Sequence, residues 1–459
     1  MQIHGRWRPI DANGCLRDIS LAPIMAADKF RPSAEVKATH VNNLLPYLPP
    51  ALAEPRMRIY AFGHGISVIG GWIQQVALGW LVFRLTHSVF LLGLTGFIMQ
   101  IPFLLLGPFT GTVVDRLPRL KLLIAIDVVL ALLAATMAVL AWQGVEDVVP
   151  YLVVAGLIGV ANAFEMPTRQ TLISEIVGDR NLMPSALAIS AMLFNSGRMI
   201  GPAIAGVMLQ YVSEAWCFAL NALSFGAIIG ALVAMRMPVP DSSSRRKSTP
   251  ANAMGFVASA RHLSAVPAVR YLLPPMVAVG LFGTAHVHLM PSIASEFFGG
   301  GPATVGLLMS ASGLGALSTA FFMSMQRGTS MQRRMIAIGP VLLGTALFAF
   351  AMSRSVGLSF FLLMAMSASI MLTSVCTNII IQQAVPDEWR GRAVGLYGMS
   401  FQGTGPIGHL LAGAVAAKIG LGTMLAINGI IIAIAAILTR QMLAQHPEAL
   451  AEPSRTPGE

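Results

Sequence analysis

An arginine in the middle of an apolar stretch is the residue of this sequence whose chemistry most needs an explanation. Arg198 lies in the segment Asn195–Gly206, which reads Asn-Ser-Gly-Arg-Met-Ile-Gly-Pro-Ala-Ile-Ala-Gly, inside a run long enough to cross a membrane as a helix. A charged side chain at the centre of a bilayer costs about 3 kcal/mol or more unless it faces a polar interior. Arg198 is therefore expected either to have a partner or to line a polar path.

Two interpretations of Arg198 follow from its position. At about 1.5 Å per residue from Leu187, Arg198 lies roughly 16 Å deep, near the middle of a bilayer. Asn195 precedes it by one turn on the same helical face, so the amide and the guanidinium can bind an anionic or oxygen-rich ligand together. Alternatively, Arg198 is a structural lock held by backbone carbonyls or by an acid on a neighbouring helix.

Asp127 is an acid within another apolar run, six residues after Lys121. It lies about 9 Å inside the expected cytoplasmic boundary. The carboxyl group can carry a proton, neutralise Arg198 across a cavity, or reach the membrane surface. Glu165 is followed by Arg169 at i+4, and this spacing predicts a salt bridge on a helix surface.

Two pairs of polar residues fall at comparable depth in the first and seventh apolar runs: Gln74 and Gln75, and His286 and His288. They are candidates for ligand contacts, and histidine can also bind and release a proton near neutral pH. Hydrogen bonding between helices is the alternative for each of them.

The elements that must position these side chains are apolar helices. The chain has 459 residues, of which 55% are hydrophobic and only 11% charged, with a mean hydropathy of +0.71. A soluble protein has about a quarter of its residues charged, and about twenty apolar residues span a bilayer as a helix. Twelve such runs are predicted: Ile59–Phe83, Val89–Val113, Leu122–Trp142, Val148–Phe164, Leu187–Tyr211, Ala215–Met235, Tyr271–Met290, Pro302–Met325, Met335–Met352, Leu358–Asn378, Val394–Ala417 and Leu421–Thr439.

The basic residues predict the orientation of these runs, because Lys and Arg concentrate in cytoplasmic loops. With a cytoplasmic N-terminus, nineteen of them fall near the inner face, whereas the outer segments hold Arg84, Arg354 and Lys418. Both termini are therefore expected in the cytoplasm. The net charge of +10 is explained by this topology, and nucleic acid is not expected as a partner.

A polar interval divides the twelve runs into six and six. Residues 241–250 read Asp-Ser-Ser-Ser-Arg-Arg-Lys-Ser-Thr-Pro, a composition typical of a flexible linker. Weak repeats support two related halves: Ala205-Gly206 matches Ala412-Gly413, and Asn221 matches Asn428, both at an offset of 207. The predicted organisation is a disordered tail at 1–55, a six-helix half at 56–236, a cytoplasmic linker at 237–268, a second six-helix half at 269–440 and a cytoplasmic tail at 441–459.

Small residues in the fifth run predict close packing and bending. Gly197 and Gly201 share one helical face and allow a neighbouring helix to approach, as does Gly206. Pro202 weakens the local hydrogen-bond ladder and permits a bend. Plain helix packing explains these residues equally well, although they also resemble the Gly-x-x-x-Gly-Pro signature on fifth helices of exporters.

The loop after the second run carries a recognisable motif. It reads Gly111-Thr-Val-Val-Asp115-Arg116-Leu-Pro-Arg119-Leu-Lys121. This Gly-x-x-x-Asp-Arg-x-x-Arg pattern resembles the loop signature of the major facilitator superfamily, in which the acid and the arginine belong to a charge network that latches two halves together. The resemblance assigns Asp115, Arg116 and Arg119 to gating, with Gly111 allowing close helix contact. A loop that merely sets the topology is the alternative.

Over residues 56–440, the chain also resembles one particular branch of this superfamily. Segments including Gly70–Thr86, Asn162–Gln170, Phe194–Pro202 and Phe218–Phe225 look like the branch that contains transmembrane secretion effectors and the enterobactin exporter. It implies an inner-membrane exporter of small molecules driven by the proton gradient. The fourth run lacks the embedded arginine of classical drug–proton antiporters and has Leu157–Asn162 there, so coupling residues of those proteins are not transferred.

The sequence thus predicts an all-α polytopic membrane protein with twelve transmembrane helices in two pseudo-symmetric halves. We expect a monomer in the cell inner membrane that exports a drug-like amphiphile or a siderophore by proton antiport and alternating access. Import of a metabolite or lysophospholipid is one alternative, and a non-transporting sensor or scaffold is another. No enzyme motif, metal-ligand spacing or cofactor site is found, and the lipid bilayer and a small-molecule substrate are the expected partners.

Overall fold

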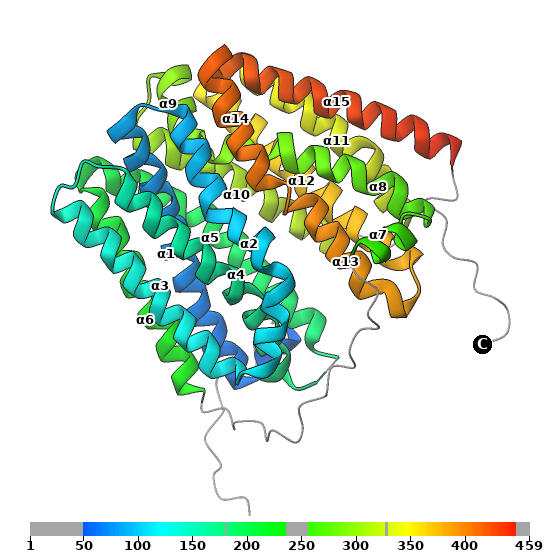
Figure 1. Ribbon diagram of the computed structural model, residues 1–459, viewed down its shortest axis with the longest axis horizontal. Coiled ribbons are helices and arrows are strands. Elements are labelled where there is room, and N and C mark those ends of the chain that lie inside the picture. Colours follow the sequence, from blue (N-terminus) through cyan, green and yellow to red (C-terminus); the bar gives the residue numbers. More distant parts are fainter. Residues whose placement is uncertain (1–48, 180, 236–255, 326–328, 447–459) are drawn as a thin grey trace, which may run out of the picture. The chain divides into compact units, whose positions relative to one another are not determined.

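Apolar helices make up the regular structure of the chain in the computed structural model (Figure 1), which describes residues 49–179, 181–235, 256–325 and 329–446. The predicted tail up to residue 48, residues 236–255 of the predicted linker and the end of the chain from residue 447 lie outside the described residues. The all-helical fold class predicted from the sequence is observed in the described part.

The first half begins with a short 3-10 turn, η2 (Pro50–Ala53), and continues with six long helices. These are α1 (Pro55–Thr86), α2 (Val89–Arg116), α3 (Arg119–Trp142), α4 (Val149–Val177), α5 (Met183–Tyr211) and α6 (Glu214–Ala234). Each matches the corresponding predicted run to within one residue or extends beyond it, and the largest extension is the end of α4, which continues from Phe164 to Val177.

The second half contains more interruptions than the sequence predicts. Its elements are α7 (Phe256–Leu263), α8 (Pro267–Ala278), the π turn η4 (Val279–Gly283), the 3-10 turn η5 (Ala285–Val287), α9 (Met290–Phe298), α10 (Pro302–Met325), α11 (Thr329–Met352), α12 (Val356–Ala384), α13 (Asp387–Phe401), α14 (Gly405–Ile419) and α15 (Leu421–Gln445). Helix α7 lies within the range predicted as linker, and α15 continues past the predicted boundary at residue 440.

Two predicted continuous helices are broken near their middles. The seventh run is divided among α8, η4, η5 and α9. Pro274 and Pro275 lie inside α8, and Pro291 lies in the first turn of α9, where a missing backbone donor is tolerated. The eleventh run is divided between α13 and α14, where Gly405 and Pro406 start a new helix.

Ten spans in the described residues are long and apolar enough to cross a membrane. The 29-residue helix α5, which carries Arg198, is not among them. In the first half, α1 packs against α5 and α6, while α4 packs against α2 and α3. In the second half, α12 packs against α10 and α11, and α11 packs against α15.

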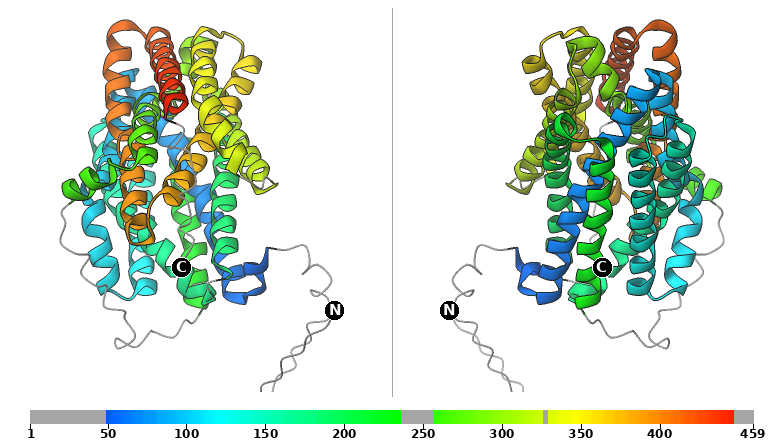
Figure 2. Two further views of the ribbon diagram at one scale, coloured as in Figure 1. Left: turned by 90° about the vertical axis from the view of Figure 1, so that its right-hand side faces the viewer. Right: turned by 90° about the vertical axis from the view of Figure 1, so that its left-hand side faces the viewer.

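The two halves meet along two helix pairs, α5 with α10 and α2 with α14 (Figure 2). We call the end of the bundle at residues 87–88 the α1–α2 end, and the end at residues 117–118 the α2–α3 end. At the α1–α2 end, a salt bridge of 2.8 Å between Arg84 and Glu214 joins the last turn of α1 to the start of α6.

Glycines allow the backbones of the two halves to touch. A Cβ atom at Gly306 of α10 would lie 2.4 Å from the carbonyl oxygen of Pro202 and 2.8 Å from the Cα of Gly206 on α5. A Cβ atom at Gly93 of α2 would lie 2.8 Å from the Cα of Gly413 on α14. Contacts this short exclude any side chain, so both pairs of helices depend on glycine near the α1–α2 end.

We expect Gly306→Ala to lower the thermal stability of the purified protein, because its methyl group would overpack the α5–α10 contact at a cost of about 1–3 kcal/mol. Gly230→Ala on α6 is the matched control, since its Cβ would meet no atom within 4 Å and alanine is the better helix former. Unfolding followed by fluorescence in detergent compares the two variants. Equal melting temperatures for both would contradict the close contact.

Candidate functional site

Arg198 lies at the contact between the two halves, near the middle of α5. Its Nη2 atom donates a hydrogen bond of 2.7 Å to the Oγ atom of Ser312 on α10. Its guanidinium also lies over the ring of Trp72 on α1, 5.9 Å from the ring centroid, within the range of a cation–π interaction. A neutral hydroxyl and an aromatic ring thus lie beside a charge near the middle of α5.

No carboxylate among the described residues forms an ion pair with Arg198. Asp127 lies elsewhere, inside the first half, where it interacts electrostatically with Tyr60 and Arg169. The proposed pairing of Asp127 with Arg198 is therefore not made in this conformation. The positive charge of Arg198 remains available to an anionic or electron-rich group.

Asn195 forms a hydrogen bond within its own helix. It is buried, and its Nδ2 atom donates a hydrogen bond of 2.8 Å to the carbonyl oxygen of Ala191 in its own helix. This bond uses one of the two N–H donors of the amide. Arg198 is thus the polar group of this pair that reaches the other half.

Histidines from both breaks of the second half gather beside α2. The Nε2 atoms of Gln100 and His288 lie 3.0 Å apart, and the rings of His288 and His409 have centroids 4.4 Å apart. His286 is buried and interacts electrostatically with Arg198. The break at η4 and η5 places His286 and His288 at the junction, and α14 brings His409 to them.

Gly96 of α2 explains how closely these rings approach the first half. A Cβ atom at Gly96 would lie 2.7 Å from the Cγ atom of His288. Gln100 follows Gly96 by one turn on the same face of α2. Gly96 leaves room for the ring of His288, and the amide of Gln100 contacts the Nε2 atom of that ring. The histidine group therefore contributes to the contact between the halves.

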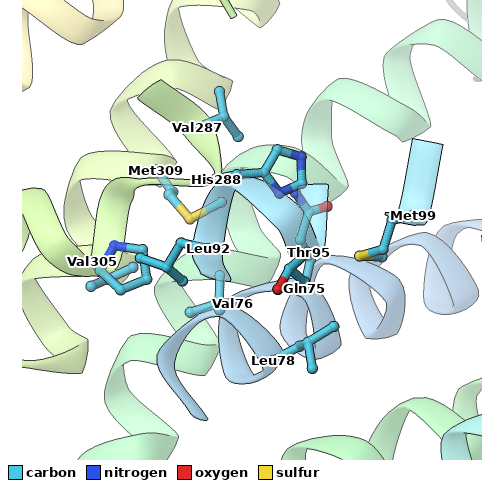
Figure 3. Close-up of a pocket in the computed structure, with 12 residues that line it drawn as sticks. Gln75, Val76, Leu78, Leu92, Thr95, Met99, Val287, His288, Val305 and Met309 are labelled. Carbon is cyan, nitrogen blue, oxygen red and sulfur yellow. The ribbon is translucent and has the colours of Figure 1, made fainter. Parts of the chain in front are cut away.

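Gln74 and Gln75 separate into two roles. The Nδ2 atom of Asn221 on α6 donates a hydrogen bond of 2.7 Å to Oε1 of Gln74, and both residues are buried within the first half. Gln75 instead faces the second half and lines a small cavity with Thr95, Met99, His288 and Met309 (Figure 3). Of the two glutamines, Gln75 is the one placed to contact a ligand between the halves.

The cavity beside Gln75 is narrow in this conformation. It draws side chains from α1, α2 and α10 and from the residues around η5 (Figure 3). Its volume of about 20 Å³ holds roughly one water molecule. A larger molecule would need the two halves to move apart.

The small residues of α5 serve two different contacts. Gly197 and Gly201 pack on α1, where added Cβ atoms would lie 2.5 Å from Val68 and 2.5 Å from Trp72 side-chain atoms. Gly206 and the carbonyl group of Pro202 meet α10. One helix thus fixes Trp72 beside Arg198 on one face and contacts the other half on the opposite face.

The loop motif lies at the α2–α3 end. Arg119 at the start of α3 forms a salt bridge with Glu175 near the end of α4, and Arg116 ends α2. A Cβ atom at Gly111 would meet no described atom within 4 Å, so the close helix contact expected there is not made in this conformation. The side chain of Asp115 lies outside the described residues.

Sequence reasoning missed three residues of this region: Trp72, Gln100 and Ser312. Trp72 was part of a motif but was given no role, and a single serine or glutamine in an apolar run carries little signal. Gly313 of α10 packs directly on α5, because a Cβ atom there would lie 2.5 Å from the backbone nitrogen of Met199. That contact places Ser312 beside Arg198.

Solved structures resemble this chain in fold. The crystal structure of nucleoside transporter NupG has a TM-score of 0.63 at 16% identity, and the match covers 85% of this chain and 98% of that one. A bacterial homolog of the human lysosomal transporter Spinster has a TM-score of 0.66 at 12% identity, covering 90% and 99%.

Sequence relatives cover most of the chain. The sequence model of a family described as transmembrane secretion effector matches residues 51–457. The multidrug efflux pump Tap of Mycolicibacterium fortuitum is 27% identical, covering 78% of this chain and 89% of Tap. The staphyloferrin A transporter of Staphylococcus aureus is 23% identical (79% and 90%), and macrolide efflux protein A of Streptococcus pyogenes is 22% identical (82% and 93%).

We expect the neighbouring glutamines to respond differently to replacement by methionine. Gln74→Met would leave the Asn221 amide without its acceptor inside the first half, at a cost of about 1–3 kcal/mol. Gln75→Met would change stability by less than about 0.5 kcal/mol, because Gln75 has room at the cavity. Thermal unfolding in detergent distinguishes them, and a larger loss for Gln75→Met would contradict this assignment.

Proposed function

This chain belongs to the transmembrane secretion effector family of the major facilitator superfamily, and we propose that it exports a small organic molecule by proton antiport. The proposed substrate is a drug-like amphiphile or a siderophore with an anionic or oxygen-rich group. The protein would lie in the cell inner membrane with both termini in the cytoplasm. Efflux pumps and a siderophore transporter among the relatives support export.

The observation that carries the proposal is the position of Arg198. Its charge lies at mid-depth, at the contact between the halves, without a carboxylate partner among the described residues. A substrate carboxylate or phenolate would replace the weak neutral partner Ser312 with a charge-assisted hydrogen bond. Trp72 offers an aromatic face for the apolar part of the same molecule.

Movement of the halves would give this site access to the two sides in turn. The excess of basic residues near the α2–α3 end supports a cytoplasmic position for that end. The glycine contacts of α5 with α10 and of α2 with α14 then close the outer side. Transport would separate these contacts and bring the cytoplasmic ends of the halves together, around the fixed middle of the bundle.

The charge of Arg198 predicts a specific order among variants. We expect Arg198→Gln to lose transport of an acidic substrate by roughly tenfold to a hundredfold, since a hydrogen bond to a charged group contributes about 1.5–3 kcal/mol. Arg198→Lys keeps the charge and should retain part of the activity. Arg440→Gln, at an exposed position near the end of α15, should match the unmodified protein.

The measurement is retention of labelled compounds by cells that lack their own pumps and express each variant. The probes are staphyloferrin A and the macrolide erythromycin, with and without a protonophore. Lower retention that the protonophore abolishes supports export by proton antiport. Increased retention would instead indicate uptake, and unchanged export by Arg198→Gln would contradict the central role of this residue.

A further inference from the structure

A second group of buried polar side chains lies inside the first half, away from the contact with the second half. Asp127 of α3 and Tyr60 of α1 have 0% exposure, and His64 of α1 has 2%. Both carboxyl oxygens of Asp127, the hydroxyl of Tyr60 and the Nδ1 atom of His64 have no hydrogen-bond partner in the structure. The substrate site proposed above uses none of these three residues.

A buried acid without a hydrogen-bond partner is informative because burial costs much more free energy for its ionised form than for its neutral form. An ionised carboxylate in an apolar interior without hydrogen bonds is very unfavourable, whereas a neutral carboxylic acid loses much less. The surroundings of Asp127 therefore suit an acid that carries a proton. The rings of Tyr60 and His64 are stacked with centroids 5.3 Å apart and provide a hydroxyl and an imidazole nitrogen nearby.

One ion pair on α4 acts on this group. Arg169 forms a salt bridge with Glu165 one turn earlier, and Glu165 is buried rather than on the helix surface as the sequence suggested. Arg169 interacts electrostatically with Asp127, Tyr60 and His64. Its guanidinium thus has one carboxylate in contact and a second within electrostatic reach.

Among the side chains that the structure describes on α2 and α6, which also pack against α3, no acid is paired with Asp127. Helix α6 packs along α3, and its acid, Glu214, lies at the far end of that helix in the ion pair with Arg84. Helix α2 ends at Arg116, beside the start of α3. Lys121 and Arg119 lie one to two turns before Asp127 on α3 itself.

We propose that Asp127 is a proton-binding site of the first half, with Arg169 as its switchable counterion. When Asp127 holds the proton, Arg169 pairs with Glu165 and the three groups have no net charge. When the proton leaves to the cytoplasmic side, Arg169 is shared between the two carboxylates and the net charge becomes minus one. This inference rests on the proposed function in one respect, that the proton bound here drives export.

The site is connected to the loop at the α2–α3 end. Asp127 lies eight residues, or about 12 Å, beyond Arg119 on the same helix. Arg119 pairs with Glu175, which lies on the same helix as Glu165 and Arg169. A change in the charge of Asp127 therefore acts on α3 and α4, the two helices that the loop motif and its salt bridge hold together.

Infrared spectroscopy of the full chain in lipid nanodiscs tests the site without any substrate. We expect a carboxylic acid carbonyl band in mildly acidic buffer that fades in alkaline buffer and is missing from Asp127→Asn. The exposed Glu388→Gln on α13 is the matched control and should keep the band. Tyr60→Phe should shift the frequency or the titration midpoint of the Asp127 carbonyl band. This milder variant still tests the site if the asparagine variant does not fold.

Two results would overturn the proposal. A band that survives in Asp127→Asn would show that another acid carries the proton, and a band that persists unchanged in alkaline buffer would show a permanently neutral acid. Proton flux into proteoliposomes separates this inference from the proposed function. Export that does not respond to a pH gradient would overturn proton antiport. A band that fades in alkaline buffer and is missing from Asp127→Asn would still establish the proton site.

Discussion

The cost of placing a guanidinium in the middle of a membrane is the constraint on which the arrangement depends. Arg198 is tolerated because it lies where two halves meet, with a serine hydroxyl and an indole ring beside it. These partners reduce the cost without cancelling the charge. A carboxylate in contact would have formed a closed ion pair, whereas a neutral hydroxyl leaves the charge able to bind something else.

Close helix contact is what brings those partners together. Gly313 admits the backbone of α5 at Met199, and Gly201 admits Trp72 from α1. The breaks at η4 and η5 and between α13 and α14 lie at the other contact, where His288 meets Gln100 and the ring of His409. Glycine and proline thus determine which polar groups reach the middle of the bundle, and the polar groups determine what can bind there.

The parts of the structure that depend on composition and period were predictable from the sequence. Apolar runs of membrane length predicted most helices, and counting residues along the fifth run predicted that Arg198 lies near the middle of its helix. What the sequence did not reveal was pairing between elements distant in the chain. Gln74 and Gln75 differ by one position, yet one bonds to Asn221 and the other faces His288, because helix rotation decides the outcome. The position of Asp127 away from Arg198 depends likewise on how α3 packs against α1 and α4.

Alkylation of a cysteine at position 312 tests most directly whether the Arg198 contact is part of a ligand site. The variant Ser312→Cys, in a background without Cys15, Cys217 and Cys376, would be treated with a small charged thiol reagent in oriented membrane vesicles. We expect the reagent to reach this cysteine from the cytoplasmic side and an exported compound to slow the reaction. A cysteine that stays unreactive from both sides, or that reacts equally fast with and without the exported compound, would contradict it.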